Sequence, residues 1–487
     1  MLGNLARQTA IYTVANLLAR GAAVVALVVL PFFLSVAQYG ALGLFLALAA
    51  ILNVVLPLEV TQGLARHYGE ADGVSKRLYA ASAFWFTAAM VGLGAILGLV
   101  FARPLCIYLL GDAAELDAFR FAIPFFAFNS LFYFAQSQFR WEFRTVDYAL
   151  VSLCFATLTL ALSVAFAALM PAPLSGVMAG QALGAAASVA LGAWRLRATI
   201  DAPPSRPHLA RMLRFSLPLV PASVALMASL YGSRLILTRM MGMAEVGAYT
   251  FAGQFAAVAG FVLLGAQSSM TPLVMSHHHE EATAPTVARF FEIFSTLGLW
   301  VCLVFGLFAP EAVALLHRPG YGPAGLLVIF LAPASLFLQL YIFFPGFAVA
   351  KRTERQMAVS IASGLVAILC NWAFIAAFGL IGAAIGTLAG ACLFLAAWVA
   401  LSQPLYPIPV RWRRVLLAWA AGAAAAAVGL TLPFPGLLAV AVKAALLAGV
   451  VLLTWKAGLV PVAGMARMLA RGLRAAPVPG PADDRQP

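Results

Sequence analysis

The chain has few charged residues. Only 10% of its 487 residues are Asp, Glu, Lys or Arg, whereas 63% are hydrophobic. Soluble domains carry roughly 25% charged residues, so this composition excludes an ordinary soluble globule. Apolar runs of about 20 residues, long enough to cross a bilayer, follow one another along the sequence. The composition predicts an all-α polytopic membrane protein.

Carboxylates are scarce in the apolar runs. Every Asp falls in a predicted loop or tail, and of the ten Glu only Glu59 and Glu292 touch the ends of predicted spans. Ionisable groups inside a membrane mark ion and proton pathways. The sequence therefore predicts no mid-membrane carboxylate that could carry a proton or a sodium ion.

Catalytic and metal-binding motifs are also missing. The five cysteines are odd in number and four lie in predicted spans, so no disulfide framework is implied. Residues 277–281 read His-His-His-Glu-Glu, but consecutive side chains point apart, and we interpret them as a solvated loop. A membrane enzyme would need a large extracytoplasmic loop or a His and acid pair in a cavity. We expect a transporter, with no metal and no cofactor.

The apolar runs predict about fourteen transmembrane helices. They lie near residues 11–34, 41–62, 78–101, 119–138, 149–170, 173–194, 216–238, 246–274, 290–309, 325–349, 357–378, 380–401, 415–432 and 436–455.

Twelve of these spans form a repeat with a shift of about 207 residues. Residues 36–41 (Val-Ala-Gln-Tyr-Gly-Ala) reappear at 243–248 as Met-Ala-Glu-Val-Gly-Ala. Residues 101–110 are echoed at 308–316, and 174–185 at 380–391. Six spans per copy give both copies the same orientation, so an axis along the membrane normal should relate them, with a cavity between them.

The repeat divides the chain into five parts. We expect an N-lobe over 1–200, a cytoplasmic linker over 201–215, a C-lobe over 216–402, two further spans over 403–457, and a cytoplasmic amphipathic and disordered tail over 458–487.

Positive charge indicates the orientation. With the N-terminus inside, only Arg103, Arg120, Arg239 and Arg318 fall outside, and 23 of the 30 Lys and Arg fall in cytoplasmic segments. Both termini are thus expected in the cytoplasm. The net charge of +13 then reflects topology and contact with anionic lipid rather than nucleic acid binding.

Two arginines lie inside predicted spans, where an unpaired charge is costly. Arg20 lies near the middle of the first span, and Arg234 lies in the seventh, its repeat partner. At the 207 shift Arg234 aligns with Leu27, two helical turns from Arg20. We expect the two arginines to line a cavity and bind pyrophosphate, because guanidinium recognises phosphate bidentately. Structural pairing with carbonyls or Glu59 is the alternative.

Uncharged polar side chains in the spans are candidates for sugar contacts, with interhelical hydrogen bonds as the alternative for each. With Glu59, the candidates are Asn16, Asn53, Gln62, Asn129, Gln136, Tyr231, Gln254, Gln339 and Asn371.

Several stretches resemble a known family. They are 214–221 (Arg-Phe-Ser-Leu-Pro-Leu-Val-Pro), 233–237 (Ser-Arg-Leu-Ile-Leu), 245–249, 320–324, and Asn371 with 378–384. The chain resembles the polysaccharide (O-antigen and exopolysaccharide) flippases of the multidrug/oligosaccharidyl-lipid/polysaccharide (MOP) exporter superfamily. It departs at Ser233, where such proteins often have Asp before the arginine.

The resemblance implies two six-helix lobes that rock in an alternating-access cycle. It also implies a bacterial inner-membrane flippase that moves undecaprenyl-pyrophosphate-linked oligosaccharide from the inner to the outer leaflet for surface polysaccharide, including lipopolysaccharide. A polysaccharide polymerase and a chain-length regulator would be its partners. The alternatives are a multidrug/cation antiporter, which should hold a membrane carboxylate, and a lipid II flippase.

Overall fold

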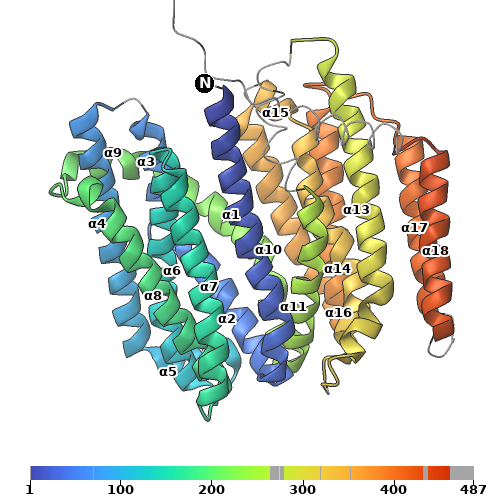
Figure 1. The fold of residues 1–487 in the computed structure, drawn as a ribbon, viewed down its shortest axis with the longest axis horizontal. Coiled ribbons are helices and arrows are strands. Elements are labelled where there is room, and N and C mark those ends of the chain that lie inside the picture. The colour runs from blue at the N-terminus through green and yellow to red at the C-terminus, as the bar shows by residue number, and fades with distance from the viewer. Residues whose placement is uncertain are drawn as a thin grey trace, which may run out of the picture.

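The computed structural model describes residues 2–69, 71–263, 274, 279–318, 320–350, 352–431 and 437–460. Within these ranges the side chains of 2–14, 20, 222, 225, 226, 228, 229, 262, 353 and 437 are not described. All regular structure in the described ranges is helical, which confirms the all-α prediction (Figure 1). His277, His278 and the tail from residue 461 lie outside the described residues.

The first lobe contains six long helices. They are α1 (Leu2–Val29), α2 (Val36–Val55), α4 (Gly73–Val100), α6 (Leu116–Trp141), α7 (Thr145–Leu169) and α8 (Pro173–Ile200). Short helices join them: η1 (Leu30–Phe32), α3 (Val60–Tyr68) and α5 (Ala102–Leu110). Local sequence sets several starts, since Ser35 forms a capping box at α2 and Pro173 occupies the first turn of α8.

The second lobe follows the linker helix α9 (Arg206–Ser216). Its helices are η2 (Leu217–Leu219), α10 (Val220–Met240), α11 (Met243–Ala257), η3 (Val258–Leu263), α13 (Thr283–Ala314), α14 (Gly322–Leu340), η4 (Tyr341–Phe343), α15 (Gly346–Val349) and α16 (Thr353–Ser402). Gly379, at φ 58° and ψ −134°, breaks α16 into two spans. Its lack of a Cβ permits this left-handed turn.

The two lobes are repeats of one another. The second helix of each lobe begins at Val36 and Met243, 207 residues apart. In the first lobe the first span, α1, packs on the fifth, α7, and the fourth, α6, packs on the sixth, α8. In the second lobe the corresponding helices α10 and α14 both pack on α16, which supplies the fifth and sixth spans. The predicted pair of six-helix lobes is confirmed.

Two further helices, α17 (Trp412–Thr431) and α18 (Leu437–Lys456), pack on α13 at the edge of the second lobe (Figure 1). Eleven helices of the described chain are long and apolar enough to cross a membrane. One of them, α16, supplies two spans, and α10 and the α11–η3 unit complete the fourteen that the sequence predicts.

The membrane carboxylates differ from the prediction in one respect. Helix α13 continues to Ala314, beyond the expected end at 309, so Glu311 lies within a helix and pairs with Lys443 of α18 at 2.5 Å. Glu292, which is 2% exposed, pairs with Arg289 and Arg411. Both carboxylates thus have cationic partners and neither is a free charge.

Candidate functional site

The two lobes meet most closely where α2 and α11 begin, at the end of the molecule opposite the start of α1 (Figure 1). We call this the sealed end. Gly40 faces the backbone of Met243 and Gly247, and a Cβ on Gly40 would lie only 2.8 Å from the Gly247 nitrogen. A Cβ on Gly247 would likewise lie 2.7 Å from the carbonyl carbon of Val36. Only glycine permits backbones to approach this closely.

Aromatic side chains fill the interior of the sealed end. The rings of Tyr39, Phe251 and Tyr321 form a triangle of edge contacts, with centroids 5.2 to 5.9 Å apart. The Tyr321 hydroxyl donates a hydrogen bond to the Leu34 carbonyl at 3.3 Å, across the two lobes. This buried cluster makes the sealed end a packed, water-excluding plug.

Two arginines of the second lobe also bind the first lobe at this end. Arg239 donates to the Tyr108 carbonyl at 2.6 Å and lies over the Tyr108 ring, 4.5 Å from its centroid. Arg318 donates to the Phe32 carbonyl and lies 5.8 Å from that ring's centroid. We call these contacts the arginine latches. In the 207-residue repeat Arg239 occupies the position of Phe32. This position therefore supplies the arginine in one latch and the aromatic partner in the other.

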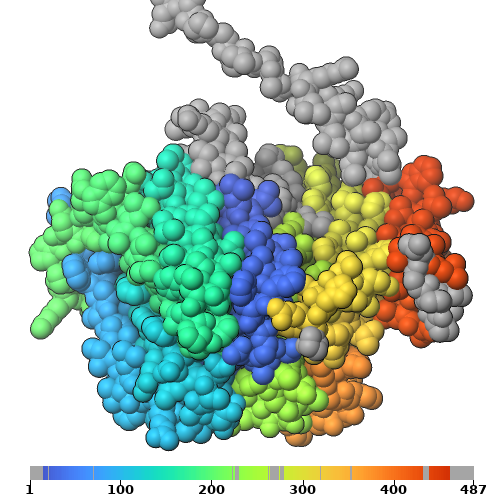
Figure 2. All heavy atoms as spheres, turned by 60° about the horizontal axis from the view of Figure 1, so that its bottom comes forward, coloured from blue at the N-terminus to red at the C-terminus, as the bar shows by residue number. Residues whose placement is uncertain are grey.

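The molecule is therefore closed on one side. Among the described residues, the hydrogen bonds between the lobes are those of Arg234, Arg239, Arg318 and Tyr321, which bind backbone carbonyls in or beside η1 and α2 or in α5. Viewed towards this face, the atoms of the two lobes form a continuous surface (Figure 2). This is one of the two end states that alternating access requires.

Arg234 lies at the seam between the lobes. It projects from α10 onto the Tyr231 ring, 5.3 Å from the centroid, and its guanidinium donates a weak 3.4 Å hydrogen bond to the Gly43 carbonyl of α2. Among the described residues no carboxylate forms an ion pair with it. The guanidinium thus has unused donors beside the other lobe. The side chain of Arg20 lies outside the described residues, although its backbone belongs to α1.

A first cavity, of 520 Å³, lies inside the N-lobe. Among its lining residues are three predicted sugar contacts, Asn16, Gln136 and Gln254, the last contributed by α11 of the other lobe. Asn16 accepts a hydrogen bond from Tyr148 at 3.1 Å, and Gln136 donates to Ser152 at 3.0 Å. These three predicted residues therefore share one polar chamber.

A second cavity, of 380 Å³, lies at the related place in the C-lobe and includes Asn371. Its wall carries a chain of hydrogen bonds from Ser233 to Tyr249 (3.1 Å), Tyr249 to Thr387 (2.8 Å) and Thr387 to Asn371 (3.1 Å). Ser233, where similar proteins often carry Asp, is 4% exposed and joins this uncharged chain. The position serves a neutral polar network in this protein.

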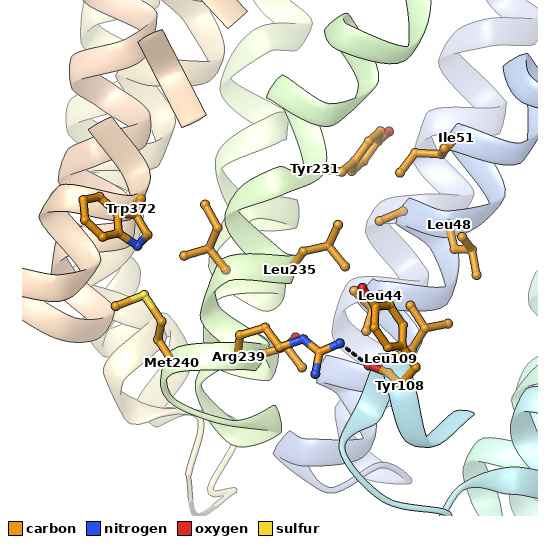
Figure 3. A pocket seen from close by; sticks show the side chains of 13 residues that line it. Leu44, Leu48, Ile51, Tyr108, Leu109, Tyr231, Leu235, Arg239, Met240 and Trp372 are labelled. Carbon is orange, nitrogen blue, oxygen red and sulfur yellow. Dashed lines mark hydrogen bonds between the residues drawn. The ribbon is translucent and has the colours of Figure 1, made fainter. Parts of the chain in front are cut away.

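A third cavity, of 460 Å³, lies on the seam between α2, α5, α10 and α16 and is lined by Tyr231 (Figure 3). Its walls are mainly aliphatic, and the Arg239 latch lies at one end. The predicted polar residues are thus distributed over three cavities rather than gathered in one.

The other predicted contacts line none of these three cavities. Asn53 accepts from Ser130 at 2.6 Å inside the N-lobe, and Gln339 donates to the Ser335 carbonyl of its own helix at 3.0 Å. Asn129 is buried, Gln62 is exposed, and Glu59 caps α3 with a left-handed backbone at φ 55°.

Sequence reasoning missed the latches and the glycine contact. Arg239 and Arg318 stand out in the sequence only as arginines outside the cytoplasmic segments. Gly40 and Gly247 were visible, because the 207-residue repeat places them at the same position of both copies. A glycine repeated in both lobes is a signal for close helix contact that could have located the sealed end.

Where α17 begins, an ion-pair cluster fixes the α17–α18 pair to α13 of the C-lobe. Arg411 binds Glu292 through its backbone nitrogen at 3.0 Å and through its guanidinium. Hydrogen bonds to the Glu292 carboxylate raise the pKa of Arg411 above its ordinary value. The cation is thereby fixed at the start of α17.

The comparisons with known proteins agree with this architecture. Residues 5–278 match the family model described as polysaccharide biosynthesis protein. The chain belongs to this family. The search of curated proteins found no match.

Solved structures share the fold. The family member is similar to the lipid II flippase MurJ in an inward closed conformation, with a TM-score of 0.72, 12% identity, and coverage of 91% of this chain and 98% of that one. An inward-facing MATE multidrug resistance transporter of the MOP superfamily gives a TM-score of 0.62 at 17% identity, covering 80% and 94%. The Vibrio cholerae MATE transporter VcmN, in its bent form, gives 0.54 at 15%, covering 83% and 97%. The chain is therefore a multi-pass membrane protein with a MOP-superfamily transporter fold.

Proposed function

We propose that this protein is a flippase that carries undecaprenyl-pyrophosphate-linked oligosaccharide from the inner to the outer leaflet of the bacterial inner membrane. The observation that carries the proposal is Arg234, a guanidinium at the lobe seam with no carboxylate partner among the described residues. Such a cation suits an anionic cargo, because phosphate oxygens match its planar donors. The family's place in polysaccharide biosynthesis points to the same cargo.

The sealed end faces outward in this proposal, because 23 of the 30 basic residues then lie on the cytoplasmic side. The cargo enters from the inner leaflet with its pyrophosphate drawn to Arg20 and its sugars towards the polar chambers around Asn16, Gln136 and Asn371. Rocking of the lobes opens the sealed end and passes the pyrophosphate to Arg234. The prenyl chain stays at the depth of the hydrocarbon core throughout.

Uncharged cavity walls fit a glycan headgroup better than a cationic drug. The side chains of both lobe cavities are amides, hydroxyls and apolar groups, with the described carboxylates of the spans held by Lys443, Arg289 and Arg411. A cation antiporter would use a free carboxylate at this depth.

The test is reconstitution of the full chain in proteoliposomes with a labelled lipid-linked oligosaccharide. A glycan-modifying enzyme added outside reports how much cargo has crossed. Wild-type protein and Arg120→Ala, a control on an exposed arginine, should flip the cargo, whereas Arg234→Ala should lose at least about tenfold in rate, the loss of one charge-assisted contact. Equal flipping by Arg234→Ala would refute the role of the arginine. Transport of lipid II or of a cationic drug in place of this cargo would refute the assignment.

A further inference from the structure

The seam cavity between α2, α5, α10 and α16 resembles a slot for a single hydrocarbon chain. On one wall it presents Leu44, Leu48 and Ile51 of the first lobe, and on the other Leu235 and Ile236 of the second (Figure 3). Its volume is 460 Å³. We call it the seam slot. The apolar walls match a hydrocarbon chain, and a chain between them gains van der Waals contacts with both lobes.

The slot matches one leaflet in depth. On α10 it extends from Arg239 to Tyr231, eight residues, or about 12 Å along the helix axis at 1.5 Å per residue. Half of a hydrocarbon core of about 30 Å is about 15 Å. A lipid with its headgroup beside Arg239 would place the first part of its tail against Leu235 and end near Tyr231.

The mouth of the slot carries the features of a lipid headgroup site. Arg239 is exposed there, and Tyr108, whose ring it covers, is 68% exposed. A tyrosine favours the interface between membrane and water. A guanidinium has five N–H donors, and the only hydrogen bond described for that of Arg239 is to the Tyr108 carbonyl. The remaining N–H groups can donate hydrogen bonds to phosphate oxygens.

The inner end of the slot leads back to Arg234. Tyr231 lines the slot with its side chain and supports the Arg234 guanidinium on its ring, 5.3 Å from the centroid. Arg239 thus lines the slot directly, whereas Arg234 does not line it and adjoins it through Tyr231.

The geometry points to the seam slot as the site that holds the isoprenoid chain of the cargo during release, while its pyrophosphate moves from Arg234 to Arg239. This inference rests on the proposed function. A cavity with room for one chain suits a single-chain polyprenyl lipid, whereas a bilayer phospholipid brings two chains. Phosphate oxygens can bind the N–H groups of Arg239 that the Tyr108 carbonyl leaves free, so the latch and the headgroup can share one guanidinium.

The slot is tested by photo-cross-linking of the full chain in nanodiscs. One probe is undecaprenyl pyrophosphate with a diazirine on its first isoprene units, and the other is phosphatidylglycerol with a diazirine on one acyl chain. Mass spectrometry maps the labelled peptides. We expect the polyprenyl probe to label 44–51, 235–240 and Trp372, and Ala47→Phe to reduce this labelling about tenfold, equivalent to about 1.4 kcal/mol. Ala190→Phe, on an exposed face of α8 away from the slot, is the control for the added ring.

Ala47 is 2% exposed, so Ala47→Phe could lose labelling through misfolding alone. A second, exposed position therefore tests the slot independently. The exposed Arg239→Gln should weaken labelling by the polyprenyl probe and Arg239→Lys should restore part of it, while a polyprenol probe without phosphate should not distinguish them. Equal labelling by the phospholipid probe, or undiminished labelling in Arg239→Gln, would overturn the slot. Wild-type protein that labels but does not flip would refute the proposed function, whereas wild-type protein that flips with an unlabelled slot refutes the slot alone.

Discussion

The contact between α2 and α11 should respond to a single methyl group. A Cβ at Gly247 meets the Val36 carbonyl group inside van der Waals distance, whereas a Cβ at Gly253, on the same helix, has nothing within 4 Å. Both Gly→Ala changes gain about 1 kcal/mol of helix propensity. Only Gly247→Ala overpacks the sealed end, at a cost of about 1–3 kcal/mol. Since the cost applies to the sealed state alone, the ratio of sealed to open molecules should fall by about 5- to 150-fold.

Distances between spin labels measure this shift. Ala37 and Ala244 are exposed, one in each lobe at the sealed end, and can carry labels as cysteines after replacement of the five native cysteines. The parent and Gly253→Ala should give one short, narrow distance distribution, and Gly247→Ala a longer or broader one. An unchanged distribution in a well-folded Gly247→Ala protein would show that the glycine contact does not hold the lobes together.

Three further changes test other parts of the structure. Arg411→Gln leaves Glu292 buried with Arg289 as its remaining cation, so the protein should lose roughly 3 kcal/mol of stability, measured as a lower Tm, while the exposed Arg413→Gln should not change it. Tyr249→Phe interrupts the hydrogen-bond chain from Ser233 to Thr387 and should lower the free energy of unfolding by about 1–2 kcal/mol. Phe255→Tyr, which lies outside that chain, is the comparison in the same thermal assay. His208 of α9 has its pKa lowered by burial and by Arg211, and its Nδ1 lies 2.6 Å from the Ser205 hydroxyl. The docking of α9 is therefore strongest above the ordinary pKa of 6.5 and weakens as the pH falls through the lowered value. The protection factors of the 206–216 amides, which correct for the slower intrinsic exchange at lower pH, should then fall in the wild type but not in His208→Gln.

Much of the fold could be read from the sequence, because lipid imposes length and hydropathy on every span. The break at Gly379 and the separate α17–α18 pair follow from local composition. The extension of α13 past 309 was not predictable from hydropathy, since Glu311 ends the apolar run. Its charge is accommodated by Lys443 of α18, a partner 132 positions away that only tertiary structure supplies.

The sequence predicts which residue types belong to the site, but not how their side chains are arranged. Sequence places Asn16, Asn371 and Arg234 in spans, but depth along a helix says little about which way a side chain faces. The structure places Asn16 and Asn371 in two separate cavities rather than in one between the lobes. The latches escaped notice because each ends on a backbone carbonyl, and a carbonyl acceptor has no sequence signature.

The reversed roles of the latches make the two halves non-interchangeable. Both cations, Arg239 and Arg318, belong to the second lobe, and both aromatic partners, Tyr108 and Phe32, belong to the first. Two copies of the second lobe would bring arginine against arginine, and two copies of the first would have neither guanidinium. The closed assembly thus requires one lobe of each kind, so the fusion of two diverged halves into one chain fixes their pairing as well as their orientation.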